Sequence, residues 1–241
     1  MGSIDKDDSL SHNNDGVSSF AFGHRTKEEV SMPTERFYRL PKEKADTIRN
    51  AAIQEFKRVP PEEVSINKII QRADISRGSF YTYFEDKYDL LNWLMGDFIE
   101  NYQRFYLISL EENRGDLWEV FEKVLTYTMD WVAEQGLVEI VGNMMKGTFF
   151  ADHVQAGAKG NCEMEKSVRE YTRMLYQRVD QSVCELDFED FEELMRMHVA
   201  SLVVSLKLYF TKEEEPETII ASYRRRMRLL RYGACPRAEL K

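Results

Sequence analysis

The segment from residue 65 to residue 91 constrains the fold of this 241-residue chain more than any other part of it. It begins with Ser65, a residue type that caps helix N-termini, and continues with apolar residues that share one helical face: Ile66, Ile69, Ile70 and Ala73. A tight connection follows at Asp74 and Ile75, and a second short helix restarts behind Ser76. The order of short helix, tight turn and short helix predicts a helix-turn-helix.

The second helix of this segment offers few residues that suit a protein core. Between Ser79 and Lys87 the chain supplies a serine, a threonine, two tyrosines and a lysine, and only Phe80 and Phe84, four apart, are placed to anchor the helix. Such a helix packs against the rest of its domain through one face and exposes polar groups on the opposite face.

The rest of the chain shows helical periodicity and no strand alternation, so the predicted class is all-α. One helix is expected before the segment, over 41–56 and ending ahead of the Pro60-Pro61 pair, and a long one is expected from Glu85 to a point before Gly115. The other expected helices are separated by turn residues and cover 116–135, 137–150, 163–185, 188–210 and 216–232.

Composition divides the chain into three parts. Residues 1–36 form an expected disordered leader or extension, because 1–31 are rich in Ser, Asp, Asn and Gly, and Met32-Pro33 resembles a second start. Residues 37–88 form the helix-turn-helix domain, and 89–241 form a larger helical domain. The formal net charge is −9, yet 37–88 carry 10 cationic and 8 anionic side chains while 89–241 carry 19 and 27. The segment 37–88 is therefore mildly basic and the segment 89–241 is acidic. This charge distribution favours local phosphate binding by 37–88 over general adhesion of the protein to polyanions.

Cysteine spacing and hydropathy predict a cytoplasmic protein. The cysteines are odd in number, widely separated and in no metal-ligand spacing, which indicates reduced thiols: Cys162, Cys184 and Cys235. The most apolar run, 199–210, has 12 residues and contains Lys207, so it is too short and too charged to cross a bilayer. Nothing at the start resembles a signal peptide.

The helix-turn-helix segment resembles the tetracycline-repressor (TetR) family of bacterial regulators. The resemblance is carried by Ala73-Asp74-Ile75-Ser76, then by Arg77-Gly78-Ser79-Phe80-Tyr81-Thr82-Tyr83-Phe84, and then by Glu85-Asp86-Lys87-Tyr88-Asp89-Leu90. Asp74 stands where the family often has glycine, and aspartate tolerates a left-handed turn better than most residues. The resemblance implies a three-helix DNA-binding domain followed by an effector-binding and dimerisation domain, in a regulator expected to be a repressor.

The resemblance implies DNA contacts for one set of residues. Ser76 would cap the second helix and leave the amides of Arg77, Gly78 and Ser79 at its positive end. Arg77 would meet a phosphate or a guanine edge, and the residues expected to enter the major groove are Ser79, Tyr81 and Thr82. The residues expected to hold phosphates on either side are Ser65, Tyr83 and Lys87. Taken singly, either tyrosine would be read as ordinary packing; the set favours DNA.

The last two long helices carry apolar stripes that are expected to form a homodimer, which would space two recognition helices by about one DNA turn. Internal packing of the same stripes is the alternative. A row of arginines in 224–231 is read as a solvated face rather than a nucleic-acid site.

An effector pocket is expected among aromatic and methionine side chains of the central helices, with ordinary core packing as the alternative. The candidates are Trp93, Trp118, Tyr127, Trp131, Met145 and Phe149, with Met144 and Phe150 beside them. His153 and His198 are expected to be satisfied, partly buried histidines. A bound effector would act through the long helix that begins near Glu85.

An enzyme and an interaction protein are the two alternative function classes. An enzyme is not supported, since the sequence has no nucleophile-base spacing, no phosphate-binding glycine loop and no metal cluster, and its histidines at 12, 24, 153 and 198 are scattered. No cofactor and no metal are therefore expected. An interaction protein that keeps a helix-turn-helix fold without binding DNA remains the alternative.

Overall fold

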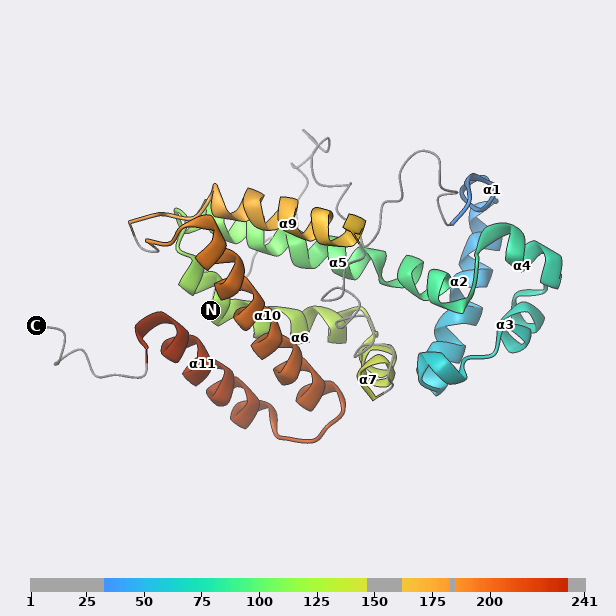
Figure 1. Ribbon diagram of the computed structural model, residues 1–241. Coiled ribbons are helices and arrows are strands. Elements are labelled where there is room, and N and C mark those ends of the chain that lie inside the picture. Colours follow the sequence, from blue (N-terminus) through green and yellow to red (C-terminus); the bar gives the residue numbers. More distant parts are fainter. Residues whose placement is uncertain (1–32, 147–161, 183–184, 234–241) are drawn as a thin grey trace, which may run out of the picture.

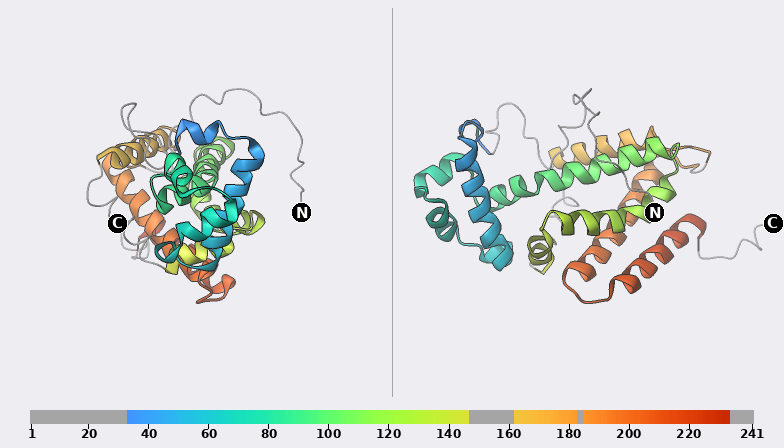
Figure 2. Two further views of the ribbon diagram at one scale, coloured as in Figure 1. Left: turned by 90° about the vertical axis from the view of Figure 1, so that its right-hand side faces the viewer. Right: turned by 180° about the vertical axis from the view of Figure 1, so that it is seen from behind.

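The computed structural model describes residues 33–146, 162–182 and 185–233, and every regular element in these ranges is a helix. Figure 1 shows a small group of helices at one end, here called the head, and a larger group at the other end, here called the body. The long helix α5 (Lys87–Glu112) runs from one group to the other, as the right-hand view of Figure 2 also shows. The all-α prediction is confirmed.

The head consists of short helices built around α2. Its elements are α1 (Glu35–Tyr38), α2 (Lys42–Arg58), the 3-10 turn η1 (Pro61–Glu63), α3 (Ile66–Ala73) and α4 (Arg77–Tyr83). The α3–α4 turn passes through Asp74, which has φ 48° and ψ 55°. This is the left-handed conformation that aspartate was expected to tolerate here. The helix expected from residue 41 begins one residue later, with Pro41 at its N-cap.

The head begins earlier than the sequence indicated. Residues 34–36, assigned to the leader, are part of the packed structure: the Thr34 amide donates to the carbonyl of Tyr83 at 3.1 Å and its hydroxyl donates to that of Thr82 at 2.8 Å. The α1 side chain Phe37 is only 3% exposed and packs against Phe84 and Trp93, with ring centroids 4.9 Å away in each case. Four residues of α1 carry too little periodicity to predict a helix.

The body contains α6 (Leu117–Glu134), α7 (Val138–Lys146), α9 (Cys162–Tyr176), α10 (Phe188–Phe210) and α11 (Pro216–Tyr232). The helix expected over 163–185 ends at Tyr176. The chain turns there because the amide of Asp180 donates to the carbonyl of Gly115 at 3.0 Å and Val179 becomes buried. Gly115 has φ +85°, and a Cβ on it would lie 2.5 Å from the Asp180 nitrogen, so this crossing requires glycine. The end of the helix expected over 137–150 lies outside the described residues.

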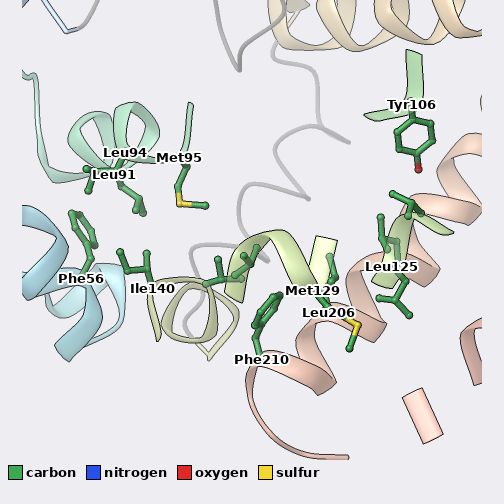
Figure 3. Close-up of a cluster of buried hydrophobic side chains, with 14 of the residues drawn as sticks. Phe56, Leu91, Leu94, Met95, Tyr106, Leu125, Met129, Ile140, Leu206 and Phe210 are labelled. Atoms are coloured by element: carbon green, nitrogen blue, oxygen red, sulfur yellow. The ribbon is translucent and has the colours of Figure 1, made fainter. Parts of the chain in front are cut away.

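Helix α7 joins the head to the body. The Asn143 side-chain amide donates to the carbonyls of Phe56 (3.0 Å) and Lys57 (2.8 Å), which lie in the last turn of α2. Figure 3 shows Phe56 close to Leu91 of α5 and Ile140 of α7, with Phe210 of α10 further along the same apolar cluster. The head is therefore attached twice, through the continuous α5 and through α7. No helix within the described ranges has the length and apolarity needed to cross a membrane.

Gly142 of α7 tests how tightly this joint is packed. A Cβ at residue 142 would lie 2.8 Å from the backbone oxygen of Phe210, so either α7 or the end of α10 must shift. We expect Gly142→Ala to lower stability by about 1–3 kcal/mol, as overpacked sites do. The matched control is Gly96→Ala in α5, where a Cβ would meet nothing within 4 Å. That change should raise stability by up to about 1 kcal/mol through helix propensity. Thermal and urea unfolding of both variants check the prediction, and equal shifts would contradict it.

Candidate nucleic-acid interface

The α4 helix is fixed from one side only. Phe80 and Phe84 are fully buried, as predicted, and the Ser76 hydroxyl accepts from the amide of Ser79 at 3.0 Å. This bond confirms the predicted helix cap, and it also occupies one of the three amides expected to be free at the helix start. Only the amides of Arg77 and Gly78 remain for another partner.

The Arg77 side chain is already positioned by two neighbours. Its guanidinium donates to the Asn67 side-chain oxygen at 3.0 Å and to the Tyr81 hydroxyl at 3.4 Å, and it lies 5.5 Å from the centre of the Tyr81 ring. All three residues are exposed. Sequence reasoning missed Asn67, although its place in the first turn of α3, on the polar face opposite Ile69 and Ala73, was a usable signal. The arrangement presents a pre-oriented cation beside a tyrosine on the outer surface of the head.

Gly78 and Thr82 form the middle of the outward face. Thr82 follows Phe80 by two residues and precedes Phe84 by two, which places it on the opposite side of the helix. Its hydroxyl donates to the carbonyl of Gly78 at 2.9 Å, so its oxygen remains available only as an acceptor. A Cβ at Gly78 would touch only the Ser76 hydroxyl, at 3.7 Å. The glycine is therefore not required by internal packing. Its effect is that no side chain projects from the outward face of α4 at this position.

Of the three residues expected to hold phosphates, Lys87 and Tyr83 make side-chain contacts inside the head, and Ser65 makes no capping bond. Lys87 donates to the backbone carbonyls of Glu62 and Val64, which ties α5 to the turn before α3. Ser65 occupies the N-cap position of α3, but its side chain makes no capping bond, contrary to the prediction. Tyr83 is half-buried and packs edge-on against Phe37 at 5.9 Å. A phosphate contact by Lys87 would require the lysine to leave these carbonyls.

A buried carboxylate organises the cations between α2 and α3. Glu55 is 0% exposed, accepts two bonds from Arg58 at 2.6 and 3.1 Å, and accepts one from Arg72 at 3.2 Å. Lys68 lies 3.9 Å away, and the Ser65 amide donates to the same carboxylate at 3.4 Å. The hydrogen bonds from Arg58 lower the pKa of Glu55 and outweigh the effect of burial, which raises it. Sequence reasoning did not identify this network, because Glu55 reads as a surface position beside the buried Phe56.

The expected effector residues do not form one group. Trp93 belongs to the head, where it packs against Phe37 and lies 5.7 Å from the Arg49 guanidinium. In the body, Tyr127 stacks on Phe105 at 4.0 Å, and the remaining contacts involve separate neighbours. Trp118 packs against Phe121, Trp131 against Phe98, and Met145 is half-buried. Phe149, Phe150 and His153 lie outside the described residues. The prediction that Trp93 lines a body pocket is wrong, because α5 carries residue 93 at its head end.

The centre of the body holds a polar cluster around His198, which is fully rather than partly buried. Its Nε2 pairs with the Tyr106 hydroxyl at 2.5 Å, its Nδ1 lies 3.4 Å from the Tyr223 hydroxyl, and its ring stacks on Phe121 at 3.6 Å. Tyr102 donates to Tyr106 at 3.1 Å. Burial lowers the pKa of His198 to about 3, so the imidazole is neutral in the folded protein. Over the described ranges, no group of three or more His, Cys, Asp and Glu side chains is placed to hold a metal ion.

Comparison with known proteins decides the family. Residues 48–94 match the profile described as bacterial regulatory proteins, tetR family, and residues 116–234 match the profile described as tetracyclin repressor-like, C-terminal domain. The chain belongs to the TetR family. It is thus a transcriptional regulator with a helix-turn-helix DNA-binding domain, in a family that is not enzymatic.

Two solved structures from this family are similar to the chain. A putative TetR-family transcriptional regulator from Syntrophomonas wolfei is 19% identical with a TM-score of 0.49, and the match covers 80% of this chain and 97% of that one. A TetR family transcriptional regulator from Chloroflexus aurantiacus is 22% identical with a TM-score of 0.39, covering 81% and 98%. No curated protein gives a significant match.

Replacing the buried carboxylate in the head of this TetR-family chain should loosen α3. We expect Glu55→Gln to lower stability at pH 7 by about 1–2 kcal/mol, because charge-assisted bonds are lost to cations that are themselves partly exposed. The folded pKa lies below the ordinary 4.5. The contribution of the Glu55 carboxylate to the free energy of unfolding is therefore fully present above pH 4.5, and it disappears as the pH falls through the folded pKa. Urea unfolding from pH 7 to pH 3 checks this. Glu119→Gln, which breaks an exposed i,i+4 pair with Lys123, should change little.

The buried histidine predicts a second pH dependence. The unfolded chain binds a proton at His198 below its ordinary pKa of 6.5, while the folded protein does so only near 3. Stability is thus lost as the pH falls through this window. We expect His198→Gln to be less stable at pH 7 but to lose about 1 kcal/mol less than wild type between pH 6 and 5. Parallel stability curves for the two proteins over this range would show that His198 is protonated in the native state.

Proposed function

We propose that this TetR-family regulator is a repressor that binds a two-fold operator as a homodimer and is released by a small-molecule effector. The head would place α4 in the major groove. The residues proposed to contact DNA are Ser65, Ser76, Arg77, Gly78, Ser79, Tyr81, Thr82, Tyr83 and Lys87. Among these, Ser79, Tyr81 and Thr82 are the candidates for base contacts.

One observation carries the DNA-binding proposal. The exposed guanidinium of Arg77 is oriented by hydrogen bonds to Asn67 and Tyr81, and neither of these exposed residues uses the arginine for packing. Exposed arginines normally lose side-chain entropy when they bind a partner. A guanidinium that is already oriented loses less, which favours binding to a phosphate or to the O6/N7 edge of guanine. The family membership places this surface in a DNA-binding domain.

The homodimer proposal is supported by apolar side chains that α10 and α11 leave roughly half exposed: Val199, Val204 and Leu229. The two helices are fixed to each other because the Arg226 guanidinium donates to the hydroxyls of Ser201 at 2.7 Å and Ser205 at 2.6 Å. A rigid pair of helices with uncovered apolar side chains favours self-association about a two-fold axis.

The effector proposal relies on the family and on the composition of the body. A cleft of about 720 Å³ lies where α6, α10 and α11 meet, lined by the candidate Trp118 together with Leu194, Met197, Arg231 and Tyr232. Its mixed aromatic and charged lining suits an amphipathic small molecule. A ligand there could favour release only if it binds the DNA-free arrangement more tightly.

Selection from a random DNA pool followed by affinity measurements tests the proposal. Wild type should enrich a two-fold consensus. Arg77→Ala should weaken binding to it by about 1–3 kcal/mol per half-site, with relaxed preference at one base pair of each half-site if Arg77 reads guanine. Tyr83→Phe should have a smaller effect, and Lys87→Ala should lower stability as well as affinity because the lysine supports the turn before α3.

The matched control is Arg104→Ala, which removes an exposed arginine from α5 at a distance from α4 and should leave affinity unchanged. If wild type enriches no sequence, or if Arg77→Ala binds like Arg104→Ala, the head does not act through α4. The interaction-protein alternative would then be favoured.

A further inference from the structure

Helix α1 is docked on the recognition helix by contacts that leave its cations outside. The Thr34 amide and hydroxyl bond the carbonyls of Tyr83 and Thr82 at the end of α4, and Phe37 is buried behind them. These contacts hold a four-residue helix that would not form alone. They fix its position relative to α4 without using Arg36 or Arg39, which are both exposed.

The two arginines border the outward face of α4. A hollow of about 460 Å³ is lined by Thr34, Glu35, Arg36, Arg39 and Thr82, and Thr82 is the residue directly opposite the buried phenylalanines. Arg36 makes no ion pair within the described ranges. Arg39 pairs with Glu35 at 2.6 Å, but both side chains are more than three-quarters exposed, so water competes with that bond.

The size of α4 places these cations near a DNA strand. Seven helical residues span about 10 Å, which is close to the roughly 12 Å width of the major groove. A group attached to the end of such a helix therefore lies at the rim of the groove, where the phosphates are. Arg77 lies on the α3 side of the outward face and α1 lies on the opposite side, so the two cationic positions flank the part of α4 that would face the bases.

We propose that α1 is a second phosphate-binding surface, on which Arg36, assisted by Arg39, binds the operator backbone next to the groove that α4 enters. The inference rests on operator binding by this head. The ammonium of Lys87, the predicted phosphate contact, is directed at backbone carbonyls, so α1 supplies a phosphate contact that does not require the lysine to leave them. Guanidinium groups bind phosphate oxygens through paired N–H donors, and a docked helix orients them before contact.

The test measures the salt dependence of affinity for the DNA that wild type selects, using the full chain. Each phosphate contact lowers the slope of log K against log salt by about 0.9. Because each subunit of the proposed homodimer supplies one Arg36, we expect Arg36→Gln to reduce the magnitude of that slope by about 2 and to weaken binding roughly 30- to 100-fold at 0.1 M salt. Arg36→Gln/Arg39→Gln should reduce it further. The preference for the selected sequence over a scrambled one should stay the same, and Arg36→Lys should recover part of the affinity.

Arg104→Gln is the matched control, because it removes one positive charge from an exposed i,i+4 pair, as Arg39→Gln does, in the part of α5 remote from α4. A slope for Arg36→Gln equal to that of Arg104→Gln would overturn the proposal. Loss of sequence preference in Arg36→Gln would also overturn it, since a base contact rather than a phosphate contact would be involved. If wild type binds no DNA, the proposed function itself fails, which is a distinct result. Unchanged thermal unfolding of the variants excludes loss of the fold.

Discussion

The burial of Phe80 and Phe84 is the interaction on which the rest of the head depends. The α4 helix has only seven residues, too few to be stable by itself, so its position comes from packing. Two fully buried phenylalanines supply about 3–6 kcal/mol of transfer free energy, and they use one side of the helix to do so. Because these two residues are enough, the remaining positions of α4 are released from the core and can be polar.

Three further contacts fix the orientation of α4, which the two phenylalanines anchor. Ser76 closes the start of α4, Thr34 satisfies carbonyls at its end, and Lys44 donates to the carbonyls of Ala73 and Asp74 at 3.1 and 2.8 Å in the turn before it. Each bond satisfies a backbone group at a helix terminus, where no bond within the helix is available. Removing such a bond leaves the apolar core of the head intact, so the expected consequence is loss of α4 orientation before loss of the fold.

Most of the long helices could be predicted from the sequence, whereas the short α1, the end of α9 and several of the contacts between helices could not. Phe80, Phe84 and Asp74 were correctly assigned because local spacing and backbone preference determine their roles. Trp93 was misread because its partner Phe37 lies far along the chain, and the internal contact of Lys87 with the carbonyl of Glu62 could not be predicted for the same reason. Glu55 shows the same limit. A glutamate beside a phenylalanine in α2 reads as a surface residue until Arg72, 17 positions later, is folded back against it.

The double attachment of the head limits how any signal could travel between the domains. If α5 alone joined them, the head could pivot around one continuous helix. The Asn143 side chain, however, holds the last turn of α2 to α7, and α7 is packed against the backbone of α10 at Gly142. A change in head orientation must therefore move α5 and α7 together or break the bonds to Phe56 and Lys57. Breaking two hydrogen bonds at a helix end costs about 1–3 kcal/mol, which is within the range of allosteric coupling energies. A ligand of the body makes the changed arrangement the major one, and so lowers operator affinity substantially, when its preference for that arrangement exceeds this cost.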